Sequence, residues 1–134
     1  MLTFSHNLKQ EISEIRAMEN VSFINIEDDG IDLILSFAVY DSDPGDIESL
    51  ILMRTPSYES FLEDYERGVS VSFKNIEDSF RLKSVALGDD IVEISDEENK
   101  YVLDMRRVEK EDINELEGIL KKMNFDNNFI IGRV

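Results

Sequence analysis

Apolar residues occupy every second position of one stretch of the chain: Ile31, Leu33, Leu35, Phe37 and Val39. A period of two places all five side chains on one face of a β-strand, whereas an α-helix would scatter them around its axis. The preceding segment, VSFINI, is rich in β-branched and aromatic residues, and an Asp-Gly pair within EDDG separates the two runs. This pattern is typical of a hairpin. The fold must therefore be built around a sheet.

Further strands follow along the chain. They are expected at residues 50–53, 69–74, 80–87, 91–95, 100–105 and 129–134. The period slips by one position near Ser84, which predicts a β-bulge or a bend in that strand. Pro44 and Gly45 interrupt the pairing after the hairpin, and glycine or acidic turns separate the later strands.

Two segments in the first half of the chain predict helices. Apolar residues recur at helical spacing between about residues 5 and 18, with charged residues on the other side. A short helix is expected after Thr55, because Pro56 suits the first turn of a helix and Gly68 suits its end. Its large side chains would be Tyr58, Phe61, Leu62 and Tyr65.

The last predicted helix has the clearest period. Its apolar face would consist of Ile113, Leu116, either Ile119 or Leu120, and Met123. Acidic residues crowd its first turn and lysines its last, an order that suits the helix dipole. Asn124 is expected to end the helix in a left-handed conformation, and Gly118 predicts close packing or local bending.

These elements include too few crossover helices for a doubly wound parallel sheet. A length of 134 residues suits one domain with a substantial core. We therefore predict a single acidic α+β domain over residues 1–134, with a mostly antiparallel sheet of about seven or eight strands. An N-terminal helix, a short middle helix and a C-terminal helix are expected to pack on this sheet.

Charge restricts the partners of the chain. Thirty Asp and Glu residues face fourteen Lys and Arg, for a net charge of −16, and the stretch from Glu27 to Glu66 holds twelve acids and one base, Arg54. Such a charge disfavours nucleic acid and anionic membranes, and it favours either solubility alone or electrostatic steering of a basic partner. The absence of cysteine, of an apolar leader and of a long apolar run predicts a cytoplasmic protein.

Motifs for catalysis or for cofactors are not recognisable. The loop DSDPGDIESLIL has its glycine at position five and leucine at position twelve, so it fails the pattern of a calcium loop. His6 is the single histidine, and the six glycines form no phosphate-binding loop. Neighbouring carboxylates are expected by chance among thirty acids. We therefore predict no enzyme activity, no metal and no cofactor.

The segment TPSYESFLEDYERG combines aromatic rings with acidic residues. Either the rings cap the sheet, or they form a recognition patch, since tyrosine anchors surrounded by charge are typical of interface hot spots. A tyrosine that pointed outward would favour the patch.

The function expected from these features is that of a non-enzymatic module that binds a basic protein. By size, acidity and lack of motifs it is of the type of the small immunity or antitoxin proteins that inhibit a nuclease toxin. The residues expected to bind the partner are Asp41, Asp43, Asp46, Tyr58, Glu63, Asp64 and Tyr65. The alternatives are a homo-oligomeric structural or regulatory module that pairs exposed strand edges in a homodimer, a DNA mimic, and a carboxylate-based enzyme.

Overall fold

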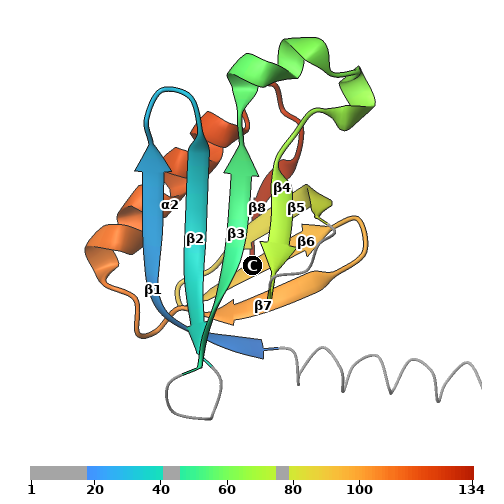
Figure 1. Ribbon diagram of the computed structural model, residues 1–134. Helices are drawn as coiled ribbons and strands as arrows, with labels where there is room; N and C mark the ends of the chain where they lie inside the picture. The colour runs from blue at the N-terminus through green and yellow to red at the C-terminus, as the bar shows by residue number, and fades with distance from the viewer. Residues whose placement is uncertain (1–17, 41–45, 75–78) are drawn as a thin grey trace, which may run out of the picture.

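A computed structural model describes residues 18–40, 46–74 and 79–134. Within them the chain forms eight strands, one α-helix and two short 3₁₀ helices (Figure 1). The strands are β1 (Met18–Asp28), β2 (Leu33–Tyr40), β3 (Ile47–Arg54), β4 (Ser70–Phe73), β5 (Phe80–Leu87), β6 (Ile91–Asp96), β7 (Lys100–Asp104) and β8 (Ile130–Arg133). The helices are η1 (Pro56–Phe61), η2 (Asp64–Glu66) and α2 (Lys110–Met123).

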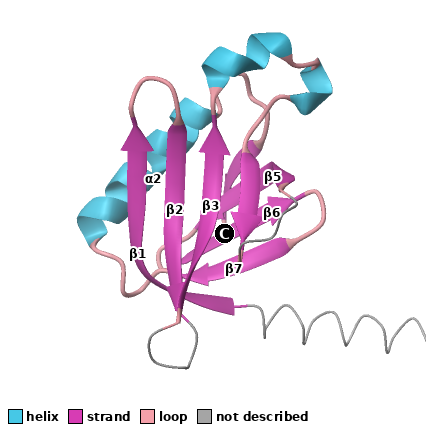
Figure 2. Cartoon of the chain, viewed as in Figure 1, coloured by secondary structure: helices cyan, strands magenta, loops and turns pink. Residues whose placement is uncertain are grey.

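Seven of these strands close into a ring. Successive strands from β1 to β7 pair antiparallel in chain order, and the start of β1 pairs in parallel with the end of β7. β8 pairs in parallel with β5, beyond the two positions at which β5 pairs with β4. Figure 2 shows β5 to β7 behind β3, at a steep angle to β1 to β3, while α2 lies behind β1 and β2. Closure of this kind satisfies strand edges that an open sheet would expose.

The alternation of β2 is confirmed. Its inward side chains are almost completely buried: Leu33, Leu35, Phe37 and Val39. Ile31 lies before the strand, in the exposed turn between β1 and β2. The predicted irregularity in β5 is also confirmed, because the register with β6 shifts between Leu82 and Ser84.

Helix α2 lies along the part of the ring where β1 and β7 no longer pair with each other. β1 pairs with β7 through Met18–Asn20, and the rest of β1 pairs with β2 alone among the described strands. Figure 1 shows α2 behind β1 and β2. Its buried side chains join the same core as the inner faces of the strands: Leu116, Ile119, Leu120 and Met123. The helix therefore completes the core that the strands leave open.

The end of α2 differs from the prediction. Asn124 has a φ of −99°, outside the left-handed region, and its backbone N–H donates to the carbonyls of Leu120 and Lys121. Its side chain instead makes two hydrogen bonds to the backbone of Phe129, one donated and one accepted, of 2.9 and 3.0 Å. The left-handed turn comes at Asn127, whose φ is 55°. Asn124 thus ties the helix to the segment that enters β8.

The prediction of three helices packed on a mostly antiparallel sheet is wrong. The structure has one eight-stranded mixed sheet and a single α-helix within the described residues. The predicted N-terminal helix falls on residues outside the described ranges, up to β1, which already begins at Met18. The predicted middle helix is two 3₁₀ turns, because the segment between Pro56 and Gly68 has no apolar face against the core that would stabilise a longer helix.

Candidate functional site

The connection between β3 and β4, residues 55–69, presents large side chains to solvent. Tyr58 is 63% exposed, Phe61 85% and Tyr65 80%. These rings do not cap the sheet, and the outward orientation of Tyr65 favours the recognition patch over packing. Figure 2 shows this connection as the helical turns that project beyond the ends of the strands. We call Tyr58, Phe61 and Tyr65 the aromatic patch.

Arg54, the last residue of β3, binds the 55–69 connection to the rest of the fold through Glu59. Its side chain is completely buried and uses all five of its N–H groups. It donates two hydrogen bonds of 2.8 Å to the carboxylate of Glu59 in η1, and two of 2.8 Å to that of Asp126. A fifth, of 2.7 Å, reaches the carbonyl of Met123 at the end of α2. The ring of Phe125 lies 4.2 Å from the guanidinium carbon.

This cluster of Arg54, Glu59 and Asp126 joins segments that are far apart in sequence. Sequence reasoning missed it, and the one signal was that Arg54 is the single base in a stretch with twelve acids. Burial lowers the pKa of Arg54, but the hydrogen bonds that Arg54 donates to Asp126 and Glu59 outweigh that effect and raise its pKa above the usual range. The guanidinium is therefore a permanent charge, and it needs both carboxylates inside the protein.

Asp126 gives a prediction for acid stability. The hydrogen bonds from Arg54 lower the pKa of Asp126 below 3.8, its usual value in an unfolded chain. Ionised Asp126 therefore stabilises the fold above that pH, and the stabilisation is lost as the pH falls through the lowered pKa. Asp126→Asn should cost about 1 kcal/mol of unfolding free energy at pH 7, since the pair is partly exposed. Urea unfolding at pH 7 and at pH 2.5 should show this cost shrinking at the lower pH, and an equal cost at both would contradict it.

Two more arginines fix the backbone of the connection. Arg81 of β5 donates from Nη1 to the carbonyls of Tyr65 and Arg67. Arg67 in turn donates to the carbonyl of Leu62 at 3.2 and 3.3 Å. The connection is therefore anchored at both of its helical turns, while its rings stay outside.

The acids of residues 27–40 and 46–66, the described part of this stretch, lie toward two opposite ends of the sheet. Asp28 of β1 pairs with Leu33 of β2, which pairs with Arg54 of β3, so the β1–β2 turn lies beside the 55–69 connection. Asp46, in contrast, precedes Ile47, which pairs with Tyr40 at the other end of β2. The eight residues of β2 separate the two ends by about 23 Å. The described acids of this stretch therefore do not form a single acidic face.

The predicted binding residues are thus only partly brought together. Tyr58, Glu63, Asp64 and Tyr65 share the 55–69 connection, and all four are exposed. Asp46 lies at the far end of β2, away from them. Asp41 and Asp43 lie outside the described residues.

Several acids beside the connection already have partners. Asp28 accepts a hydrogen bond from Lys122 of α2, which lowers the pKa of that carboxyl, with help from the backbone N–H of Gly30. Asp32 accepts a bond of 2.6 Å from the hydroxyl of Thr55. The carboxylate of Asp64 is almost fully exposed and lies 3.5 Å from Arg67. The Asp64 carboxylate is thus far more exposed than that of Asp28, although both have a partner.

Other kinds of site find no support in the described residues. Over residues 18–40, 46–74 and 79–134, no three acidic or histidine side chains come together to hold a metal ion. In the same ranges no helix is long and apolar enough to cross a membrane. No family model matches the chain, and neither a curated protein nor a solved structure matches it significantly.

Proposed function

We propose that the 55–69 connection is a recognition surface for a basic protein, and that this chain is a non-enzymatic binding module of the inhibitor type. The observation that carries the proposal is the exposure of all three rings of the aromatic patch on an anchored backbone. Exposed aromatic rings at the centre of an interface supply most of its binding energy when they insert into a partner. Here they would do so with little ordering cost, because the backbone that bears them is already fixed.

Charge argues for a basic partner. Glu63, Asp64 and Glu66 flank Tyr65, and the β1–β2 turn adds further acids at the same end of the sheet. With a net charge of −16, the whole molecule attracts a basic protein over about one Debye length at physiological salt. Such steering accelerates association, whereas the rings determine how long the complex lasts.

Removal of two rings should abolish the interaction without unfolding the protein. Tyr58→Ala with Tyr65→Ala should weaken binding by more than about thirtyfold, because truncating a hot-spot ring costs at least about 2 kcal/mol. Both side chains are exposed, so the unfolding midpoint should stay close to that of the wild type. The measurement is capture of basic proteins from a host lysate, followed by titration of the captured protein by calorimetry.

Two comparisons make this test specific. The variant Asp46→Asn with Glu48→Gln removes two charges from the opposite end of the sheet and should leave binding intact. Glu63→Gln with Asp64→Asn should slow association and reduce its dependence on salt. If the captured protein bound the variant without Tyr58 and Tyr65 as tightly as the wild type, the aromatic patch would not be the binding surface.

A homodimer is the second candidate, and one observation favours it. Among the described strands, β8 pairs with β5 alone, and Ile130 at its start is 70% exposed. A second copy could add its own β8 to this edge across a two-fold axis. Light scattering should then give twice the monomer mass at high concentration, and Ile130→Lys should return it to the monomer. A monomer mass at all concentrations would dismiss the dimer.

A further inference from the structure

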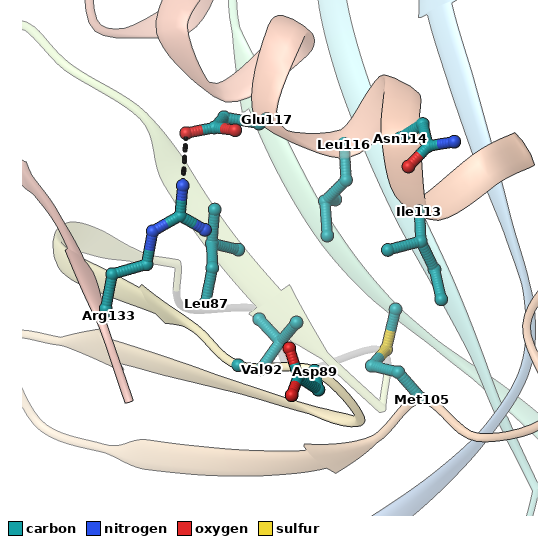
Figure 3. Close-up of a pocket in the computed structure, with 10 residues that line it drawn as sticks. Leu87, Asp89, Val92, Met105, Ile113, Asn114, Leu116, Glu117 and Arg133 are labelled. Atoms are coloured by element: carbon teal, nitrogen blue, oxygen red, sulfur yellow. Dashed lines mark hydrogen bonds and ion pairs between the residues drawn. The ribbon is translucent and has the colours of Figure 1, made fainter. Parts of the chain in front are cut away.

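A pocket in the surface lies apart from the aromatic patch. It is a cavity of ≈ 180 Å³ between the first half of α2, the β5–β6 turn and β8 (Figure 3). Five apolar side chains line it: Leu87, Val92, Met105, Ile113 and Leu116. Figure 3 shows Ile113 and Leu116 reaching down from the helix toward the other three. The cavity shares no residue with the Arg54 cluster or with the 55–69 connection.

The size of the cavity suits one small apolar group. A cavity of about 150 Å³ with aliphatic and aromatic walls stays dry and accepts a benzene molecule. The space here opens to solvent and has both apolar and polar residues in its lining. An apolar group that bound against the apolar side chains would be removed from water, which favours binding.

Some polar residues at the rim of the cavity have ion-pair partners, and one does not. Arg133 of β8 donates to Glu117 of α2 at 2.9 Å, and Lys121 lies 3.8 Å from the same carboxylate. Figure 3 shows this pair at one side of the cavity and Asp89 beside Val92, across from the helix. Asp89 is exposed and has no hydrogen-bond or ion-pair partner within the described part of the chain. Within the described residues, the carboxylate of Asp89 is therefore unpaired and lies beside the apolar side chains of the cavity.

We propose that this cavity binds a small organic cation, namely a primary amine on an apolar body about the size of one six-membered ring. The apolar body fills the space below Ile113 and Leu116, and the ammonium group donates to the carboxylate of Asp89. Such a ligand matches the negative field of the protein, whereas an anion of the same shape meets repulsion from Asp89 and from the net charge of −16. The proposal is independent of the recognition surface.

The test is a set of three ligands of one shape. Isotope-labelled protein is titrated with 2-phenylethylamine, with the neutral 2-phenylethanol and with the anionic 3-phenylpropionate, and amide cross-peaks are followed by NMR. The amine should shift the peaks of residues 88–92 and 113–117. It should bind about fivefold more tightly than the alcohol, the range expected for one exposed ion pair, and the acid should bind more weakly than both.

Matched variants locate the charge and the cavity. Asp89→Asn should remove the preference for the amine over the alcohol, whereas Asp90→Asn makes the same change next to the cavity lining and should keep it. Ile113→Trp should fill the cavity and weaken all three ligands. Equal binding of amine and alcohol to the wild type, an equal effect of the two Asn variants, or unmoved peaks at residues 88–92 and 113–117 would each overturn the proposal.

Discussion

Replacing Arg54 with methionine is expected to lower the free energy of unfolding by about 3 to 5 kcal/mol, the usual cost of breaking a buried ion pair from one side. Methionine fills a similar volume but donates no hydrogen bond, so the carboxylate of Glu59 would remain largely buried without a cation. Asp126 is exposed enough to gain water in its place. Chemical denaturation monitored by circular dichroism would measure the loss.

Two controls separate the buried charge from the removal of an arginine. Arg133 makes an ion pair with Glu117 at 2.9 Å in which both side chains are more than a third exposed, and Arg133→Met should cost less than about 1 kcal/mol. The double variant Arg54→Met with Glu59→Met should recover most of the stability lost by Arg54→Met, because no buried charge is then left alone. If the double variant were as unstable as the single one, the cost would come from packing and not from the charge.

The Arg54→Met variant should also affect the proposed recognition surface. Arg54 is the group that holds η1, through Glu59, to the end of α2. Once it is lost, the connection that bears the aromatic patch would have to be ordered on binding, which costs affinity. The affinity and stability of Arg54→Lys should lie between those of the wild type and of Arg54→Met. An ammonium group keeps the charge, but it does not keep the five N–H groups in their fixed geometry.

Replacing Leu120 with alanine is expected to cost about 2 to 5 kcal/mol, the range for a large-to-small change in a core. Leu120 is completely buried on the face of α2 that completes the core between the strands. The cavity left by the change would lie at the centre of that contact, where the surrounding strands can relax only partly. Thermal and urea unfolding would measure the effect.

Gly118, two positions earlier in the same helix, is the matched control. It is exposed, and a Cβ built on it meets nothing within 4 Å. Close packing, one of the two alternatives expected at this glycine, is therefore wrong. Gly118→Ala should raise the free energy of unfolding by about 0.5 to 1 kcal/mol, because alanine loses less backbone entropy in a helix. A destabilised Gly118→Ala variant would show that α2 has neighbours at this face.

Local patterns were enough to place most elements. The alternation in β2, the slip in β5 and the apolar face of α2 depend on neighbours within a few residues, where the period of the backbone determines which side chains share a face. The same patterns could not predict the parallel pairing of β1 with β7. It joins Met18 to Val102, and nothing in either strand specifies a partner so distant in sequence.

The candidate site shows the same division. Aromatic residues three and four positions apart were visible in the sequence, but their spacing alone did not reveal whether a core would receive them. The exposure of Tyr65 depends on the 3₁₀ turns of the connection and on where Arg81 holds it. The acids of residues 27–66 follow one another closely in the sequence, yet β2 separates those that the structure describes into two groups, because a strand is extended.

The sequence by itself determined an acidic domain built on a sheet, with a long strand at residues 33–40 and an amphipathic helix near its end, because these follow from composition and short-range periodicity. The tertiary structure alone decided the closure of the ring and the burial of Arg54 between Glu59 and Asp126. Arg54 and Asp126 are 72 positions apart. Their contact exists only because the fold brings the end of β3 beside the end of α2, and a buried guanidinium is stable only with such partners.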